Sequence, residues 1–401
     1  MMFSSRLDAD LSPGRLQRAL DRLRASGTPL LDLTRSNPPQ CGLGPPPEAL
    51  TRGLAVPRLA EYSPDPRGML GARQAVARYY ADRGLPTRPE AVFLSASTSQ
   101  AYAELIKLFA NPGDEILVPQ PSYPLFDMLV ALEGCRLVRF PSYCSAQGGW
   151  RIDEGALERA FTSRTRAVIL VSPNNPTGAY LPPDQLSAIQ RLCAAKGCPI
   201  ILDEVFYDYP AEGFTALAAP GEDEARGLTL RLSGLSKVVG APQIKLGWVR
   251  ISGADAAVRE AGGRLEYIAD AYLSASTPAQ LAAEVLLPAR GPLQARIRER
   301  LGENHRAAGQ AFAGGSPAHL HSREGGWYLV VRLPEGEDDE DLTFHLLVDD
   351  RVIVQPGFFF DFPQGEHLVL SLLTPVAEFA EGLSRVAARI AARAYGKRIK
   401  V

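Results

Sequence analysis

Short apolar runs and amphipathic stretches alternate over the middle of the chain. Runs with strand character lie at residues 91–94, 115–118, 136–140, 167–171, 199–202, 229–232 and 246–251. Apolar residues recur every three or four positions, which predicts helices, at residues 99–110, 125–132 and 183–195. Strands that alternate with helices in this way predict an α/β fold, in which a mostly parallel sheet is sandwiched by helices.

The pattern changes in the C-terminal part of the chain. Three strands and two helices are expected there, at residues 325–331, 352–357, 368–372, 340–348 and 376–394. This mixture predicts a second, smaller α+β domain. The acidic run at residues 335–340 is expected to be a solvated loop, as runs of charge usually are.

Length and composition narrow the class of protein. The chain has 401 residues, of which 46% are hydrophobic, enough for a large core and about two domains. A net charge of −2 gives no basic field for nucleic acid. The N-terminus lacks the apolar core of a signal peptide, and no apolar stretch is long enough to cross a bilayer. The five cysteines have irregular spacings, so we expect free thiols and a cytoplasmic location.

Three polar motifs follow or end predicted strands. Residues 172–178 read Ser-Pro-Asn-Asn-Pro-Thr-Gly, residues 200–205 read Ile-Ile-Leu-Asp-Glu-Val, and residues 233–237 read Ser-Gly-Leu-Ser-Lys. Ligands of parallel sheets gather at the carboxyl ends of the strands, which is where these motifs lie. An asparagine in a turn, a carboxylate at a strand end and a lysine, in this order, are what pyridoxal phosphate (PLP) needs.

Each of the three side chains has a predicted role toward PLP. Lys237 is the nucleophile, whose amine forms a Schiff base with the cofactor aldehyde. Asp203 holds the ring nitrogen protonated, so that the ring withdraws electrons. Asn175 donates its amide to the ring phenolate oxygen. Because a buried carboxylate without a partner is costly, Asp203 and the cofactor need each other.

In this order, the three motifs resemble those of the class I/II aminotransferases, the aspartate-aminotransferase-like PLP enzymes of fold type I. The resemblance covers nearly the whole chain. It implies a large PLP-binding domain at residues 46–290 and a small domain formed by residues 1–45 and 291–401. It also implies a long bridging helix near residues 278–306 and a homodimer with shared active sites.

The resemblance assigns the phosphate of the cofactor to a helix N-terminus. Backbone N–H groups there favour an anion, and Ser97 and Thr98 add hydroxyls. Ser236 is assigned to the same cofactor site. Lys245 stands where relatives usually carry a phosphate-binding arginine, and lysine supplies the charge without the bidentate fork.

Aromatic positions both follow and depart from the family pattern. Tyr123 matches the aromatic that stacks on the cofactor ring, and Tyr62 resembles the tyrosine that reaches the phosphate in the partner subunit. Phe206 stands where relatives place a phenol near the ring oxygen. Losing that hydrogen bond is expected to favour the protonated Schiff base and to raise its pKa. Tyr207 and Tyr209 are open as replacements.

A second departure concerns the substrate carboxylate. Relatives carry Arg-Leu-Ser near the C-terminus, and this arginine grips the carboxylate as a bidentate pair. Val369 holds that place here. Arg35 and Ser36 lie in the segment that lines the substrate pocket of relatives, so we expect them to bind substrate together with Asn175. A solvated loop position is the alternative for Arg35.

Other residues near the C-terminus are weaker candidates. Arg323 and Arg332 flank the strand that contains Trp327 and Tyr328, and either arginine could face a carboxylate. We expect Trp327 and Tyr328 to belong to the core rather than to a pocket. The five histidines form no spaced ligand set, so the sequence predicts no metal site.

The leading hypothesis is a PLP-dependent aminotransferase that moves an amino group between an L-amino acid and a 2-oxo acid. Lys237, once released from the cofactor, would act as general base at the substrate Cα. A PLP-dependent lyase, decarboxylase, cyclase or oxidase is the alternative, because anchoring of the carboxylate decides which bond breaks. A third hypothesis is a non-catalytic protein of the same fold. The sequence shows no helix-turn-helix arm and no basic patch, which argues against it.

Overall fold

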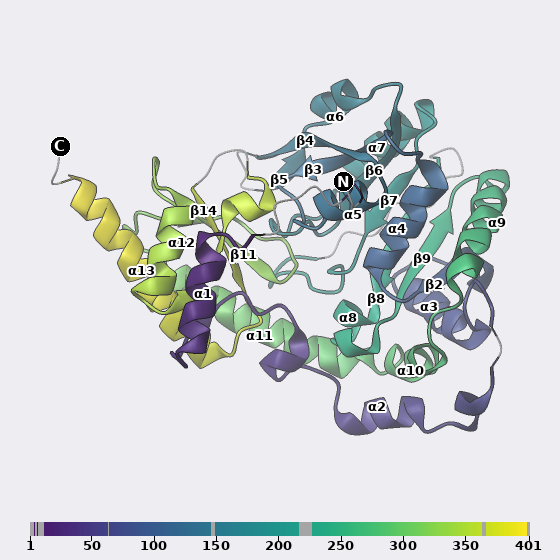
Figure 1. The fold of residues 1–401 in the computed structure, drawn as a ribbon, viewed down its shortest axis with the longest axis horizontal. Coiled ribbons are helices and arrows are strands. Elements are labelled where there is room, and N and C mark those ends of the chain that lie inside the picture. Colours follow the sequence, from purple (N-terminus) through teal and green to yellow (C-terminus); the bar gives the residue numbers. More distant parts are fainter. Residues whose placement is uncertain are drawn as a thin grey trace.

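The computed structural model describes residues 4, 6, 12–62, 64–145, 149–215, 227–362 and 366–398. This part of the chain forms two lobes (Figure 1). The large lobe surrounds an eight-stranded sheet, and the small lobe surrounds a four-stranded sheet. Helix α11 (Arg290–Ala311) runs along the small lobe and reaches the large one, so it connects the two.

The large sheet is mostly parallel, as the sequence predicts. Its strands lie in the order β2, β9, β8, β7, β6, β3, β4, β5, and within the described ranges only β9 and β5 run antiparallel to their neighbours. The strands are β2 Val92–Ser95, β3 Glu115–Gln120, β4 Arg136–Cys144, β5 Trp150–Ile152, β6 Thr165–Val171, β7 Ile200–Asp203, β8 Thr229–Gly234 and β9 Gly247–Ser252.

Helices cover both faces of this sheet, because successive residues of a central strand point to opposite sides. In β6, Ile169 joins the apolar cluster under α4 (Thr98–Phe109), whereas Leu170 joins the cluster under α7 (Pro183–Ala195). The other helices of this lobe are α2 Pro47–Leu54, α3 Leu70–Asp82, α5 Phe126–Leu132, α6 Glu154–Ala160, α8 Leu235–Val238, α9 Asp255–Tyr272 and α10 Thr277–Leu286. Because β6, β7 and β8 are neighbours and run parallel, their carboxyl ends lie side by side at one edge of the sheet.

The two ends of the chain meet in the small lobe. β1 (Leu31–Asp32) pairs in parallel with β12 (Val352–Ile353), and the antiparallel sheet has the order β10, β11, β14, β13. Its strands and the helices of this lobe are β10 His319–Leu320, β11 Tyr328–Arg332, β13 Gln355–Pro356, β14 His367–Ser371, α1 Arg15–Ala25, α12 Asp339–Val348 and α13 Val376–Arg398. Short 3-10 turns are η2 Pro38–Cys41, η3 Pro57–Ala60, η4 Pro89–Ala91, η6 Pro242–Ile244 and η7 Gly357–Phe360. The exact domain boundaries stay a prediction.

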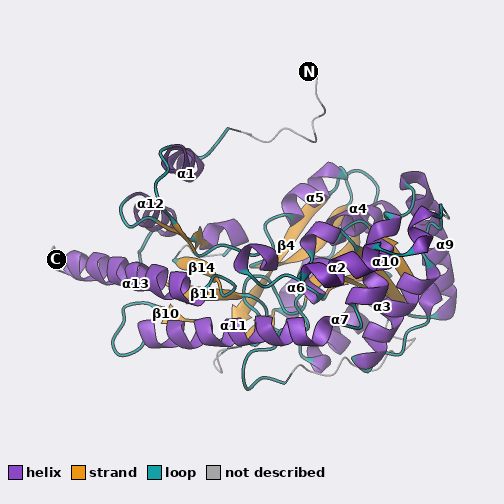
Figure 2. Ribbon diagram, turned by 90° about the horizontal axis from the view of Figure 1, so that it is seen from below, coloured by secondary structure: helices purple, strands orange, loops and turns teal. Residues whose placement is uncertain are grey.

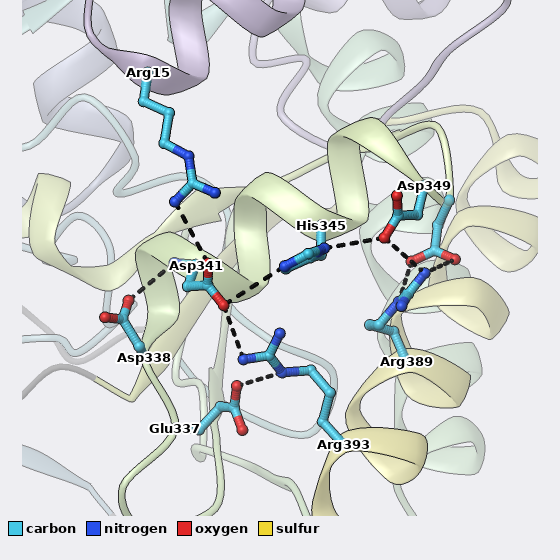
Figure 3. Close-up of polar contacts among 9 residues, drawn as sticks. Arg15, Glu337, Asp338, Asp341, His345, Asp349, Arg389 and Arg393 are labelled. Atoms are coloured by element: carbon cyan, nitrogen blue, oxygen red, sulfur yellow. Dashed lines mark hydrogen bonds and ion pairs between the residues drawn. The ribbon is translucent and has the colours of Figure 1, made fainter. Parts of the chain in front are cut away.

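Ion pairs connect three helices of the small lobe (Figure 3). Arg15 on α1 lies 3.4 Å from Asp341 on α12. Arg393 on α13 pairs with Glu337 at 2.6 Å and with Asp341 at 3.1 Å. Since Arg15 and Asp341 are partly exposed, their pair contributes at most about 1 kcal/mol. α1 lies at the edge of the lobe next to α12 in Figure 2, and the Arg15–Asp341 pair joins these two helices.

Two predicted elements are each divided in the structure. The helix expected at residues 278–306 is interrupted at residues 287–289, between α10 and α11. Pro288 explains the break, because it lacks an N–H and its ring clashes with the preceding turn. The strand expected at residues 352–357 splits into β12 and β13, which belong to different sheets.

The acidic run at residues 335–340 is not wholly solvated, in contrast to our expectation. Glu337 is 4% exposed, because its carboxylate is paired with Arg393, and α12 already begins at Asp339. The five cysteines form no disulfide. None of the helices in the described ranges combines the length and apolar character that a bilayer crossing requires.

Asn304, buried on α11, fixes the chain that follows β14. Its amide donates to the carbonyls of Leu372 at 2.9 Å and Thr374 at 2.7 Å. We predict that Asn304→Ala lowers the free energy of unfolding by about 2–4 kcal/mol, because two buried carbonyls lose their donor. Chemical denaturation measures this loss, with Gln310→Ala, an exposed amide of the same helix, as control. Equal stability of the two variants would contradict the prediction.

Candidate active site

A cavity of about 220 Å³ lies where the two lobes meet, at the carboxyl ends of β6, β7 and β8. The large lobe lines it with Thr98, Ser99, Tyr102, Tyr123, Pro124, Phe126, Val171, Asn175, Asp203, Val205, Phe206, Ser236 and Lys237. The small lobe and the segment before η2 add Ser36, Tyr328, Gln355 and Phe360. Asp203 and Lys237 are the only charged side chains among these described lining residues.

Asp203 ends β7 and is buried without a cation at salt-bridge distance in the part of the chain that the structure describes. The Tyr102 hydroxyl donates to its Oδ2 at 2.8 Å, and the Val205 N–H donates to its Oδ1 at 2.9 Å. Burial raises the pKa of Asp203 to about 6, although these two donors act in the opposite direction. The carboxylate is therefore held in place but lacks a positive partner.

The adjacent carboxylate, Glu204, has the opposite environment. It lies 2.6 Å from Arg231 and 3.1 Å from Arg83, all three side chains being buried. Although burial acts to raise the pKa of Glu204, these two arginines hold it below its ordinary value. The two arginines thus neutralise Glu204, and Asp203 is the carboxylate of this pair that lines the cavity.

Lys237 lies on the short helix α8, directly after β8. Its Nζ donates to the Ser36 carbonyl at 3.4 Å and lies 4.8 Å from the centre of the Trp327 ring. Desolvation by these surroundings lowers the pKa of the amine to about 8, while Asp203 acts to raise it. The Tyr209 hydroxyl donates to the Lys237 carbonyl at 2.6 Å and fixes the backbone. The amine therefore loses its proton, and becomes nucleophilic, at a lower pH than an ordinary lysine does.

Asn175 presents its amide to the cavity from the turn after β6. Its Oδ1 is buried and has no hydrogen-bond partner within the described ranges. The turn itself is fixed by the Thr177 hydroxyl, which donates to Asn174 Oδ1 at 2.9 Å. Gly178, at φ +71°, packs so closely that an added Cβ would stand 2.3 Å from the Gly325 carbonyl oxygen. A rigid turn therefore holds an amide that still has bonding capacity.

The N-terminus of α4 opens into the cavity and forms a site for an anion. Ser97 caps the helix, its hydroxyl accepting from the Gln100 N–H at 3.0 Å, while Thr98 and Ser236 line the cavity. Gly247 on β9 permits the close approach, because a Cβ there would lie 2.7 Å from the Thr98 nitrogen. Lys245 is exposed, adopts φ +55° and is not a lining residue, so the structure does not bring it to this site.

Aromatic side chains form much of the remaining wall. Tyr123 lines the cavity, and the Phe206 ring lies 5.6 Å from Lys237 Nζ. Neither tyrosine that was open as a replacement for the missing phenol lines the cavity. The Tyr207 ring packs on Arg83 at 3.6 Å, and the Tyr209 hydroxyl is bonded to backbone.

The structure does not bring Arg35 to the cavity. Its guanidinium pairs with Glu378 of α13 at 2.9 Å, and only the neighbouring Ser36 lines the wall. Our expectation that Arg35 faces the substrate therefore does not agree with this geometry. Arg323 donates to a backbone carbonyl at 3.1 Å, and Arg332 is exposed at the end of β11. Neither of these two arginines is a lining residue.

Tyr102, Tyr328, Gln355 and Phe360 are among the lining residues that sequence reasoning missed. Tyr102 lies one helical turn after Thr98, so their shared face could have indicated it. Tyr328 was expected in the core, but strand alternation buries Trp327 completely and turns Tyr328 toward the cavity. Gln355 and Phe360 carry no sequence signal, since only the packing of the small sheet brings them here.

The residues present fit PLP. A buried carboxylate that lacks a cation suits the protonated ring nitrogen, and an amine of lowered pKa suits the aldehyde. The α4 N-terminus with its hydroxyls suits the phosphate. The Asn175 side chain makes no hydrogen bond within the described ranges, so its Nδ2 donor suits the ring oxygen, and its buried Oδ1 is open to a donor.

Comparisons with known proteins agree with this chemistry. The sequence profile of the family described as Aminotransferase class I and II matches residues 28–382. The glutamate-pyruvate aminotransferase AlaA of Escherichia coli (strain K12) is 26% identical over 385 residues, 93% of each chain. An alanine aminotransferase of Mycobacterium tuberculosis (strain ATCC 25618 / H37Rv) is 29% identical over 386 residues, 93% of this chain and 88% of that protein.

Solved structures show the same fold. The alanine aminotransferase from Pyrococcus furiosus superposes with a TM-score of 0.87 at 23% identity, over 98% of this chain and 100% of that one. An aminotransferase from Escherichia coli gives a TM-score of 0.84 at 24% identity, over 98% of each chain. With the family match across residues 28–382, these findings show that the chain belongs to the class I and II aminotransferases and is a PLP-dependent enzyme of amino group transfer between amino acids and 2-oxo acids.

Proposed function

We propose that Lys237 is the residue to which PLP attaches and that the enzyme transfers the amino group of an L-amino acid to a 2-oxo acid. One observation carries the proposal: the Lys237 amine and the unpaired Asp203 carboxylate line the same cavity, which the Asn175 amide also lines. When bound, PLP supplies an electron sink that stabilises negative charge at the substrate Cα.

The side chains divide this work. Lys237 would serve as the general base that takes the proton from the substrate Cα and as the acid that returns it, for which a pKa of about 8 is well placed. Asp203 keeps the ring nitrogen protonated, and Asn175 donates to the ring oxygen. Tyr123 lines the cavity and would stack on the ring, and Phe206 lies beside Lys237 without a hydrogen-bonding group.

The phosphate would be bound at the α4 N-terminus. Ser97 caps that terminus, while Thr98 on α4 and Ser236 on α8 offer hydroxyls that line the cavity. Lys245 would act only as an exposed positive charge near β9. Under these assignments, neutral N–H and O–H donors would bind the phosphate to a greater extent than a cation would.

We also propose a cytoplasmic homodimer with shared active sites. Tyr62 is 80% exposed, and Tyr267 and Leu273 expose large apolar side chains on the same lobe, at 82% and 65%. Such exposed apolar groups are typical of surfaces that pair with another subunit. Across a two-fold axis, Tyr62 would reach the phosphate of the other subunit. Five free cysteines are in keeping with a reducing cytoplasm.

L-Glutamate with pyruvate as acceptor, and L-alanine with 2-oxoglutarate as acceptor, are the first pairs to test. The relative in Escherichia coli is named for glutamate and pyruvate, and the relative in Mycobacterium tuberculosis is named for alanine. Donor conversion would turn PLP into its amine form, and the acceptor would reverse it. Release of CO₂ or ammonia without this conversion, for every donor, would contradict the proposed reaction.

Lys237→Ala tests the attachment site. We predict loss of the visible absorbance of the PLP-loaded enzyme and a fall in amino transfer of at least about 10³-fold, because nucleophile and general base are both removed. The matched control is Lys196→Ala, an exposed lysine after α7. Retained absorbance and turnover in Lys237→Ala would exclude this residue.

Asp203→Asn separates stability from function. Because the pKa of Asp203 rises to about 6 on folding, its ionisation destabilises cofactor-free protein increasingly as pH rises from about 4 to 7. We predict that the cofactor-free variant is more stable than wild type at pH 7 and equally stable at pH 4, by denaturant titration. Its PLP affinity should fall at least about tenfold, because the ring nitrogen loses its counter-charge. A variant less stable at pH 7 with unchanged PLP affinity would contradict this account.

The lowered pKa of Lys237 predicts how cofactor capture depends on pH. Only the neutral amine attacks the aldehyde, so the uptake rate of cofactor-free protein should rise through a midpoint of about 8 and then level off. Stopped-flow absorbance measures this rate. A midpoint near the ordinary lysine value of about 10.4 would show that the amine is not desolvated.

A further inference from the structure

The small-lobe wall of the cavity carries no charge. Ser36, Tyr328, Gln355 and Phe360 form it, and the Ser36 hydroxyl hydrogen-bonds the Tyr328 phenol. The Gln355 amide is the polar group of this wall with capacity to spare: within the described ranges its buried Oε1 acceptor has no hydrogen-bond partner, and its Nε2 donor, the group that a carboxylate could accept from, makes no hydrogen bond either. A bound group in the cavity is what can satisfy it.

Gln355 lies next to the position where the sequence resemblance places a carboxylate-binding arginine. That position is Val369, which is completely buried in an apolar cluster with Val330 and Phe360. β13 and β14 are antiparallel, and Gln355 stands directly opposite Val369. A neutral amide on the neighbouring strand thus occupies the wall where an arginine is expected, and the apolar cluster leaves no place for a cation at Val369 itself.

Arginines in the surroundings do not take over this role. Arg35 is paired with Glu378 at 2.9 Å, and Arg139 is paired with Asp361 at 2.8 Å. Arg323 donates to the Gly326 carbonyl at 3.1 Å; within the described ranges it has no carboxylate at salt-bridge distance and its buried Nε has no hydrogen-bond partner, but it is not a lining residue. None of the three lines the cavity, so within the described ranges the only cation available to a substrate is Lys237, the proposed cofactor attachment site.

We propose that Gln355 binds the carboxyl end of the substrate through a neutral hydrogen bond, in place of an arginine. The proposal rests on the proposed function of this cavity. An amide has a donor and an acceptor but no charge, so it serves a carboxylate or a carboxamide, whereas a guanidinium strongly favours the anion. The substrate class therefore extends from α-amino acids to their α-carboxamides.

Steady-state kinetics with matched probes test this role. The probes are L-alanine with L-alaninamide and L-glutamate with L-isoglutamine, and the pair used is the one whose acid the wild-type enzyme converts. Gln355→Leu is expected to raise KM about 10- to 100-fold for both members of the pair, with a smaller change in kcat, because both lose the same hydrogen bond. Gln310→Leu makes the same change on the exposed face of α11 and should leave KM unchanged.

Changing the charge at position 355 tests the chemical class directly. Gln355→Arg should increase the kcat/KM ratio of acid over amide at least about tenfold, because a bidentate ion pair then favours the anion. Gln355→Glu, which is nearly isosteric, should reduce the ratio by a similar factor through charge repulsion. The ratio cancels any common effect of a variant on folding or on PLP content.

The outcomes distinguish the two proposals. If Gln355→Leu and Gln355→Glu both leave the KM values and the acid-to-amide ratio within twofold of wild type, Gln355 does not bind the substrate and the inference is overturned. If wild type takes up no PLP, or transfers no amino group from either acid, the proposed function fails instead. PLP absorbance of each variant, measured alongside, shows that the cofactor site is intact.

Discussion

The site depends on a buried carboxylate, Asp203, that the fold holds beside a desolvated amine, Lys237, without giving the carboxylate a salt bridge. Its pKa of about 6 and the lysine pKa of about 8 are consequences of the same burial. A bound cofactor ring would supply a positive charge for Asp203 and an aldehyde carbon for Lys237. Its binding would therefore offset the free-energy cost of burying these two groups. Cofactor binding energy and the cost of folding this edge of the sheet are therefore coupled.

The scaffold creates this asymmetry through the neighbour of Asp203. Glu204, the next residue, is neutralised by the buried Arg83 and Arg231, so the pKa values of two adjacent carboxylates shift in opposite directions. The parallel arrangement of β6, β7 and β8 then brings the turn amide of Asn175 to the same edge. The small lobe closes the cavity with uncharged groups, so the large lobe supplies all the charge.

The large-lobe part of this arrangement was predictable from the sequence, because it rests on local patterns. Continuous apolar runs identified the buried strands, and Asp203 and Lys237 follow directly from strand ends. The small-lobe wall was not predictable, since residues such as Tyr328 and Gln355 reach the cavity only through the register of β11, β13 and β14. Arg35 shows the limit from the other side: its segment was placed correctly, but Glu378, far away in sequence, takes its guanidinium.

The most direct measurement locates the cofactor on the chain. Purified protein loaded with PLP is reduced with borohydride, which makes the attachment permanent, and is then digested for peptide mass spectrometry. The account predicts a single modified peptide that carries the label on Lys237, and a much smaller labelled fraction of Lys237 after Asp203→Asn at the same limiting PLP concentration. Label on another lysine, or a chain that takes up none, would contradict it.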